Sequence, residues 1–308
     1  MRSMRANPRP RSVAAGIILA LAATLPAACG GSTPGGSTPT TSARMNPARL
    51  DPALHELLPQ SVKDRGVVRV GTDASYAPMS SFAPDGRTII GVEPDLGVEM
   101  GKVLGVRLEF VDSDFSTLLA DVARGDLDLG ISAMTDTPER AKTADFVNYF
   151  WAGTSIVVQR GNPRGIHELN DLCGKAVAVE AGTVQQDLLK RTQNNCGTGP
   201  IVVKPYPNNS DALVELRTGR VAAALLDLPP AIFLVNDLKT RSQYQLASTA
   251  QYEPGPYGIV VAKGQPGLRD AVQGALRKLQ SSGAYADVLA RWHVQSGAVT
   301  QVTINSGR

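Results

Sequence analysis

The sequence predicts an α/β protein in which parallel sheets carry helices on both faces. Short apolar, β-branched runs alternate with segments whose apolar residues recur at helical spacing. Strands separated by helices in this way are typical of parallel sheets. Roughly 280 of the 308 residues follow an N-terminal targeting segment, which is enough chain for two modest lobes.

The expected elements follow in order along the chain. Strands are expected at Val67–Gly71, Val106–Val111, Leu127–Ser132, Ala176–Glu180, Val202–Tyr206 and Ala222–Asp227, and helices at Asp95–Leu104, Phe115–Arg124 and after each later strand. Parallel sheets bind ligands beyond the carboxyl ends of their strands. Polar residues gather at those ends, namely Asp73, Ser132 to Thr135, Glu180 to Thr183, and Asp227. We therefore expect a ligand site at this edge.

The first 28 residues have the features of an export signal. Four arginines precede an apolar run from Val13 to Leu25, which is too short to span a bilayer comfortably. Pro26-Ala27-Ala28-Cys29 follows, so the segment resembles a bacterial lipoprotein signal cleaved before a lipidated Cys29. The usual Leu lies one residue further from the cysteine than expected, at Leu25, and an ordinary secretory signal is the alternative.

Residues 29–60 are expected to form a tether and lead-in. Gly30 to Ser42 reads GGSTPGGSTPTTS, a composition that cannot bury a core and that favours a flexible linker. It would let the folded part reach a neighbour on the same membrane surface.

The mature part carries almost no net charge. Of 31 basic residues four precede Cys29, so 27 remain against 28 acidic ones. No basic stripe indicates a nucleic-acid partner. We expect no cofactor and no metal, because His55, His167 and His293 lack ligand spacing.

Two cysteines remain after Cys29. In an exported protein a pair such as Cys173 and Cys196 favours a disulfide over a metal site.

Several motifs together resemble one known family. They are Val70-Gly71-Thr72-Asp73-Ala74-Ser75-Tyr76-Ala77-Pro78-Met79, Gly91-Val92-Glu93-Pro94-Asp95-Leu96, Asp126-Leu127-Asp128, Ser132 to Arg140, Asp145-Phe146, Leu172-Cys173-Gly174-Lys175, Ala181-Gly182-Thr183 and Leu225-Leu226-Asp227. In order and spacing the chain is similar, from about residue 60 to 295, to the polar amino-acid solute-binding proteins, family 3 of the bacterial ABC-importer receptors. Val92 and Pro94 depart from the family pattern.

The resemblance implies a type II periplasmic-binding-protein-like fold with two α/β lobes and two hinge strands. Residues 61–152 and 256–308, including the C-terminal tail, would form the first lobe, and residues 153–255 the second. The lobes would close over one amino acid and deliver it to the permease and ATPase of an ABC importer. We expect a monomer without enzymatic activity, held by its lipid on the outer face of the cell membrane.

Arg140 is the expected partner of the ligand's α-carboxylate. Thr137-Pro138-Glu139-Arg140 predicts a helix start, and a cation near the third position opposes the helix dipole unless an anion binds there. The resemblance places Ala133 N–H and the Thr135 hydroxyl beside it, after Ser132. A solvated arginine at a helix end is the alternative.

The second lobe is expected to supply the opposite charge. The resemblance gives the ligand's α-ammonium to Asp227 and further N–H donors to Gly182 and Thr183. Arg140 and Asp227 would then clamp a zwitterion between the lobes. A plain turn at Gly182-Thr183 and an ordinary helix cap at Asp227 remain alternatives.

Four further residues are expected to contact the ligand's side chain. Tyr76 and Phe115 align with positions that sandwich it, although either could instead belong to the core, and Asp73 aligns with a carboxylate at its polar end. Glu180 is expected on the far wall or, alternatively, in solvent. Three carboxylates facing Arg140 would disfavour aspartate and glutamate, so a cationic or amide side chain fits better.

Two other functional classes remain open. Some relatives are cyclohexadienyl dehydratases, in which a pocket carboxyl acts as general acid, a role Glu180 could take. A ligand-sensing receptor domain is the second alternative, against which the lack of a later membrane-length apolar run counts.

The signal analysis predicts that Cys29→Ser releases the protein from the membrane or leaves it unprocessed, because the lipid-bearing thiol is lost. Fractionation of cells and mass spectrometry of the mature N-terminus measure this. Unchanged membrane retention of the variant would contradict the anchor.

Overall fold

The computed structural model describes residues 49–197 and 199–307. The expected export signal 1–28, Cys29 and the Gly30–Ser42 tether lie outside these residues. Within the described part of the chain, no helix combines the length and apolarity needed to cross a membrane.

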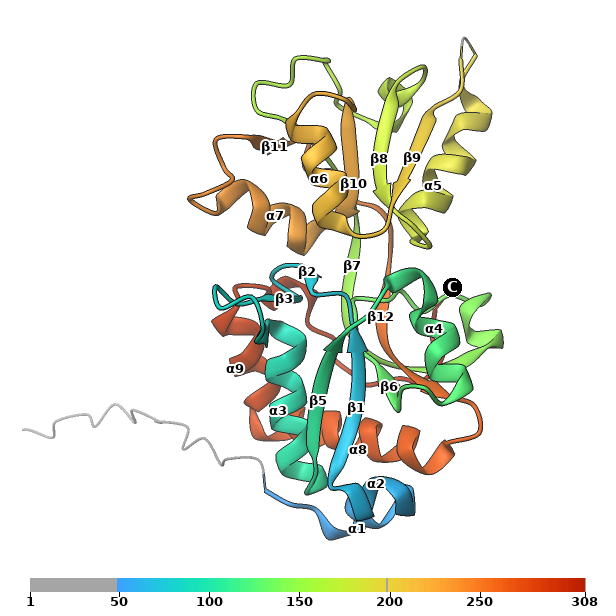
Figure 1. Ribbon diagram of the computed structural model, residues 1–308, viewed down its shortest axis with the longest axis vertical. Coiled ribbons are helices and arrows are strands. Elements are labelled where there is room, and N and C mark those ends of the chain that lie inside the picture. The colour runs from blue at the N-terminus through green and yellow to red at the C-terminus, as the bar shows by residue number, and fades with distance from the viewer. Residues whose placement is uncertain (1–48, 198, 308) are drawn as a thin grey trace, which may run out of the picture. The chain divides into compact units, whose positions relative to one another are not determined.

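One large sheet passes through both lobes. Its strands follow the order β5-β1-β6-β12-β7-β10-β8-β9, with β11 added beside β7. The bounds are β1 Val67–Thr72, β5 Arg107–Asp112, β6 Leu129–Gly130, β7 Ala144–Gln159, β8 Ala176–Glu180, β9 Val202–Tyr206, β10 Ala223–Asp227, β11 Tyr244–Leu246 and β12 Tyr252–Ala262. The pairs β1–β5, β1–β6, β8–β9 and β8–β10 are parallel, whereas β7 and β12 run antiparallel to their neighbours. Figure 1 shows two α/β lobes with β7 and β12 passing between them, so the predicted two-lobed fold is confirmed.

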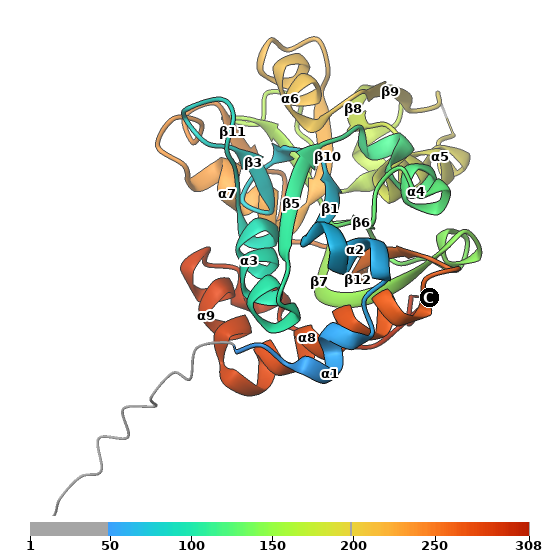
Figure 2. The same ribbon diagram turned by 60° about the horizontal axis from the view of Figure 1, so that its bottom comes forward.

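Helices cover both faces of the first lobe's strands. Val68 and Val70 of β1 point to a core shared with α3 (Val92–Leu104), α8 (Pro266–Ser282) and α9 (Ala284–Arg291). On the other face, Leu118 of α4 (Phe115–Arg124) packs with Phe146 and Val260. Alternate side chains of a strand point to opposite faces, so Val260 of β12 enters this core while its neighbour Val261 enters the first. Figure 2 shows α3 and α4 on opposite sides of β1 and β5.

The second lobe repeats this arrangement. Val177 and Val179 of β8 pack under α5 (Val184–Thr192), while the intervening Ala178 faces α6 (Asn209–Arg217) and α7 (Leu228–Asn236). All three residues are almost fully buried. The carboxyl ends of β8 and β10 lie at the side of the lobe that faces the first lobe (Figure 1).

Smaller elements complete the described chain. They are α1 Pro52–Glu56, α2 Gln60–Arg65, a separate sheet of β2 Ser75–Tyr76, β3 Ser80–Phe82 and β4 Ile89–Ile90, and the 3₁₀ turns η1 Arg140–Lys142, η2 Leu169–Leu172, η3 Gln193–Asn195 and η4 Gln295–Gly297.

Most expected elements agree with the structure to within three residues at either end, but one strand is much shorter than expected and one helix is a single turn. The strand expected at Leu127–Ser132 is regular only at Leu129–Gly130. On either side of it, single backbone bonds to the first strand continue, from Asp128 N–H to the Arg69 carbonyl (3.0 Å) and from Ile131 N–H to the Gly71 carbonyl (2.9 Å). Side chains add to them, since the Asp128 carboxylate accepts the Arg69 N–H (2.7 Å) and the Ser132 hydroxyl accepts the Asp73 N–H (2.9 Å).

The helix expected to start at Thr137 is a single 3₁₀ turn. The Thr137 hydroxyl does accept the Arg140 N–H (3.2 Å), as a capping residue would. The turn ends at Lys142 because β7 begins at Ala144, which leaves no room for a further turn.

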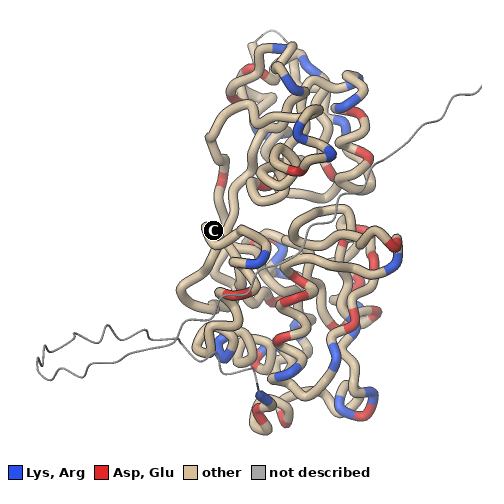
Figure 3. Tube along the Cα trace, turned by 90° about the vertical axis from the view of Figure 1, so that its left-hand side faces the viewer, with Lys and Arg blue, Asp and Glu red and all other residues tan. Residues whose placement is uncertain are grey.

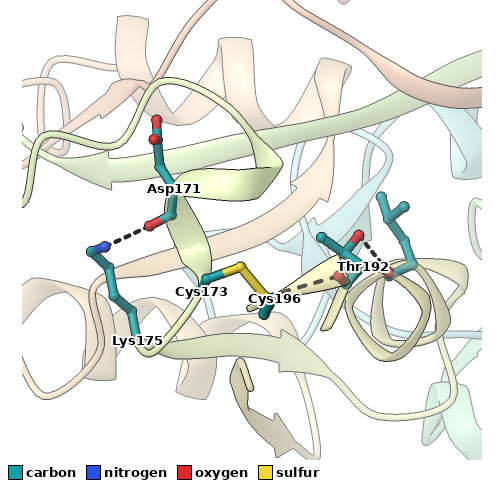
Figure 4. The surroundings of a disulfide bond; sticks show 6 residues. Asp171, Cys173, Lys175, Thr192 and Cys196 are labelled. Atoms are coloured by element: carbon teal, nitrogen blue, oxygen red, sulfur yellow. Dashed lines mark hydrogen bonds between the residues drawn. A yellow bond between two sulfur atoms is a disulfide. The ribbon is translucent and has the colours of Figure 1, made fainter. Parts of the chain in front are cut away.

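The predicted disulfide is confirmed. Cys173 and Cys196 are bonded with their Cα atoms 5.5 Å apart. The bond joins the end of η2 to the end of η3 at the edge of the second lobe, where the Lys175 ammonium also donates to the Asp171 carbonyl (Figure 4).

Basic and acidic residues are interspersed over both lobes, and the traced part of the chain shows no stripe of one sign (Figure 3). This distribution agrees with the near balance of charge in the sequence that follows residue 28.

We predict that the double variant Cys173→Ser, Cys196→Ser loses about 3 kcal/mol of unfolding free energy, because the bond joins residues separated by 23 positions in the sequence. Urea denaturation of both proteins measures the loss. Reductant should destabilise the wild type to the variant's level and leave the variant unchanged. Equal midpoints in oxidising buffer would contradict a stabilising role.

Candidate functional site

A small cavity lies where the two lobes face each other. Its lining contains ten of the eleven expected site residues and two others: Asp73, Tyr76, Phe115, Ser132, Ala133, Thr135, Arg140, Glu180, Thr183, Val184, Gln185 and Asp227. The cavity measures about 10 Å³, room for about one water molecule. In this arrangement the side chains themselves fill the space between the lobes.

Arg140 projects from the first lobe and reaches the second. Its Nη1 donates to the Thr135 carbonyl and its Nη2 to the Gly182 carbonyl, each at 2.8 Å. The guanidinium carbon lies 5.6 Å from the centre of the Phe115 ring, a cation–π arrangement. Burial lowers the pKa of Arg140 to about 10, so it remains a cation at neutral pH.

Asp227 ends β10 in the second lobe and is 5% exposed. Its carboxylate accepts hydrogen bonds from the Gln185 amide (2.7 Å) and the Tyr76 hydroxyl (3.1 Å). The Tyr76 oxygen also accepts the Asp227 N–H at 2.8 Å, so Tyr76 links the lobes twice. Burial raises the pKa of Asp227 to about 6, against the lowering effect of the Tyr257, Tyr76 and Gln185 side chains and of the Arg140 charge.

Asp73 and Glu180 lie at opposing strand ends, and both are at least nine-tenths buried. The Asp73 carboxylate accepts from Ser75 N–H (2.8 Å) and the Ser75 hydroxyl (3.0 Å). Glu180 Oε1 has no hydrogen-bond partner among the described residues. Burial, then Asp73 and Asp227, raise the pKa of Glu180 well above its usual range.

Gly182 and Thr183 form the turn into α5. The Thr183 hydroxyl accepts the Gln186 N–H and caps the helix. Gly182 does not line the cavity, and its N–H donates to the Gln186 side chain (3.0 Å). Its backbone has φ +77°, and a Cβ there would lie 3.1 Å from Ser116 Cα of the other lobe. Only glycine therefore permits this approach of the lobes without strain.

The expected donor role of Ala133 is altered in the structure. Its N–H donates to Glu93 Oε1 at 2.6 Å, so this donor is already used. Glu93 is fully buried, and its carboxylate also accepts from the hydroxyls of Ser80 (2.6 Å), Tyr149 (2.5 Å) and Thr72 (3.4 Å). Glu93 thus fixes the loop on which Ser132, Ala133 and Thr135 lie.

Three residues with roles at the site were not identified from the sequence. Val184 and Gln185 line the cavity from the first turn of α5, and Glu93 holds the loop of Ala133. The available signals were a polar Gln two residues after Thr183 and the position of Glu93 within the Gly91–Leu96 motif.

The arrangement suits a ligand that carries both charges. A cation from one lobe and a carboxylate from the other lie on one cavity, and each is desolvated, which strengthens charged contacts. Within residues 49–197 and 199–307, no group of three or more His, Cys, Asp or Glu could hold a metal ion.

The sequence profile of the bacterial extracellular solute-binding proteins, family 3, matches residues 68–295. The chain belongs to this family. It is 29% identical over 82% of its length to the arginine-binding protein ArgT of Corynebacterium glutamicum, of which it also covers 82%. It is 30% identical over 77% of its length to the L-cystine-binding protein TcyJ of Escherichia coli K12, covering 86% of that protein.

A solved family structure has the same fold. The ancestral amino acid-binding protein AncCDT-1, a precursor of cyclohexadienyl dehydratase, superimposes with a TM-score of 0.67 at 30% identity, over 75% of this chain and 97% of that one. The family assignment made from the sequence motifs is therefore confirmed.

The raised pKa of Asp227 predicts a pH-dependent stability. The folded protein binds this proton more tightly than the unfolded chain, so the stabilisation is complete below about pH 4 and is lost as the pH rises through about 6. Between pH 4 and 7.5, Asp227→Asn should lose roughly 2.4 kcal/mol less unfolding free energy than the wild type. Urea denaturation at both values tests this, with the exposed Glu139→Gln as control. A difference that does not change with pH would contradict it.

Proposed function

We propose that this family member captures a polar or cationic amino acid outside the cytoplasm and delivers it to an ABC importer. The observation that carries the proposal is the pair Arg140 and Asp227, which come from different lobes and line one cavity. Relatives named for binding arginine and L-cystine support an amino acid as the ligand.

Arg140 binds the ligand's α-carboxylate in this proposal. A guanidinium has five N–H donors, of which the two bonds to Thr135 and Gly182 use two. The remaining donors are available for a carboxylate, beside Thr135, Ser132 and the α5 turn with Thr183. The Phe115 ring under the guanidinium restricts its orientation.

Asp227 binds the α-ammonium. An ammonium in contact with the carboxylate favours its charged form, so ligand binding would lower the pKa of about 6. Tyr76 and Gln185 hold the carboxylate in place for this contact.

Binding requires the lobes to separate and close again, because the cavity holds about one water molecule. We assign residues 61–152 and 256–308 to one rigid lobe and residues 153–255 to the other. The closing contacts are Arg140 to the Gly182 carbonyl, Tyr76 to Asp227, and Asn209 N–H to the Ser75 hydroxyl (3.1 Å). Two strands between the lobes permit such hinge closure.

We further propose that the protein acts as a monomer without a cofactor, and that Cys29 anchors it by lipid to the outer face of the cell membrane. The anchor would keep it near the importer's permease, which accepts the amino acid while the associated ATPase drives transport.

A cyclohexadienyl dehydratase activity is the second candidate. It is suggested by Glu180, whose raised pKa suits a general acid, whereas AncCDT-1, the precursor of such an enzyme, is itself named as an amino acid-binding protein. The buried pair Arg140 and Asp227 favours an intact amino acid instead. Incubation with prephenate and with arogenate separates the two functions, and we expect no product from either.

We predict that Arg140→Ala and Asp227→Ala each weaken amino-acid binding by at least about 30-fold. Removing one partner of a buried charged contact costs 2–5 kcal/mol. Calorimetry measures the affinities, and ligand analogues lacking the α-amino or the α-carboxyl group should bind as poorly to the wild type.

The matched control is Arg191→Ala, which removes an exposed arginine paired with Glu253 on the surface. It should bind like the wild type. Near-normal affinity in either site variant would overturn the residue assignment, and tight binding of an analogue lacking one of the two groups would overturn the amino-acid proposal.

A further inference from the structure

The C-terminal tail, residues 298–307, packs on the first lobe and leads back toward the strands between the lobes. It follows η4 and lies beyond residue 295, where the match to the family profile ends. Val302 in its middle is buried, and its carbonyl accepts a hydrogen bond from the Gln273 side chain of α8 (3.0 Å). The tail is thus anchored on α8 before its last residues reach β7.

The tail covers the edge of β7 that faces away from β12. In the second lobe, β10 occupies this edge from Thr154 onward. In the first lobe the tail takes that place, since Asn148 N–H donates to the Thr303 carbonyl (2.9 Å) and Asn305 N–H donates to the Phe146 carbonyl (3.0 Å). A bare strand edge would leave these backbone groups unpaired. The backbone bonds therefore fix the tail relative to β7.

The end of the tail holds the side chain of Asp136, which is 1% exposed. Asp136 Oδ2 accepts the Gly307 N–H (2.9 Å) and the Asn148 side-chain amide (3.0 Å). The Asn148 amide oxygen in turn accepts from the hydroxyls of Thr303 (3.0 Å) and Ser306 (2.8 Å). Gly307 lies so close that a Cβ there would overlap the Asp136 carbonyl oxygen. The tail and Asp136 therefore cannot shift independently of each other.

The peptide unit between Thr135 and Asp136 connects this network to the ligand site. Its carbonyl accepts the bond from Arg140 Nη1, and its N–H donates to the Pro256 carbonyl of β12, each at 2.8 Å. The side chain that the tail holds belongs to the same unit. Asp136 itself does not line the cavity, so the tail reaches the site through the Thr135 carbonyl and the guanidinium. The orientation of Arg140 therefore depends on a peptide held between β12 and the tail.

We infer that the C-terminal tail is a positioning element of the ligand site, with Gly307 and Asp136 as its positioning residues. The inference rests on the proposed function, in which Arg140 binds the ligand's α-carboxylate. Without the tail, Asp136 loses a hydrogen-bond donor and the Thr135 carbonyl is held less firmly against the guanidinium. Arg140 then samples more orientations, and ordering it on binding lowers the affinity.

Hydrogen exchange without ligand tests the positioning directly. Gly307→Ala should raise the exchange rates of the Asp136, Ala141 and Thr143 amides at least about tenfold, because their hydrogen bonds all lie in the loop that the tail holds. Amides of β8 in the second lobe should be unchanged, which distinguishes local release from a general loss of stability. Gly264→Ala is the matched control, since a Cβ at that position meets no atom within 4 Å.

Calorimetry with arginine and with glutamine measures the consequence for binding. Gly307→Ala, and a second variant whose chain ends at Val302, should each bind both amino acids roughly 3- to 10-fold more weakly. The factor should be the same for both, because they share the α-carboxylate and differ in the side chain. In the Arg140→Ala background, ending the chain at Val302 should add less than about a twofold loss, because the tail acts through that arginine.

The outcomes separate the inference from the proposed function. Unchanged exchange of the 136–143 amides in both tail variants overturns the inference, whichever amino acid the protein binds. Unchanged affinity in both variants, or the same loss with and without Arg140, also overturns it, and each of these results leaves amino-acid capture standing. If no amino acid binds to the wild type, the proposed function fails and the inference fails with it.

Discussion

The antiparallel pairing of β7 with β12 is the interaction on which the rest of the molecule depends. β7 pairs with β12 from Ala144 onward, and beyond Thr154 it pairs with β10 and β11 of the second lobe. Both lobes are therefore built on the same two strands. Register shifts in the pairing lie between Tyr252 and Gly255 and between Tyr257 and Gly258, near the passage from one lobe to the other. Such irregularities bend a strand locally and interrupt its hydrogen-bonded ladder.

The cleft is organised by a second buried contact set. Glu93 brings together β1, β3, β7 and the loop after β6 through its four hydrogen bonds. Burial raises its pKa, while the Ser80 and Tyr149 hydroxyls and the Ala133 N–H lower it. Because a buried carboxylate is stable only when its oxygens are satisfied, the positions of these four segments are tied to one another. The loop with Ser132, Ala133 and Thr135 is therefore held in place by the bond from Ala133 N–H to Glu93.

Local patterns were sufficient to predict much of the fold. The elements Phe115–Arg124, Ala176–Glu180 and Val202–Tyr206 have the predicted bounds because their apolar spacing is decided within the segment. Which strands pair with each other is not decided within a segment. The long strand β7 is buried along nearly its whole length and shows no alternation of apolar and polar residues, so it was not predicted from the sequence. Thr137 does cap a helical turn as its sequence signals predict, but the start of β7 at Ala144 limits the helix to that one turn.

The same distinction holds for the candidate site. Motif spacing was enough to nominate residues that the fold gathers around one cavity, because strand ends of a parallel sheet share an edge. The use of Ala133 N–H by Glu93, and of Asp227 by Gln185 and Tyr76, depends on segments that meet only after folding. Charged residue types can be read from a sequence, whereas their hydrogen-bond partners cannot.

The close approach of Gly182 to Ser116 has a practical consequence for sensor engineering. A side chain at position 182 would act as a wedge between α4 and the α5 turn, without touching the cavity itself. The resting angle of the two lobes can thus be changed from a position outside the cavity, and the change would also reach Arg140, whose guanidinium donates to the Gly182 carbonyl. A pair of fluorophores on the two lobes would report that angle, so residue 182 is a position at which opening of the lobes and ligand affinity can be altered together.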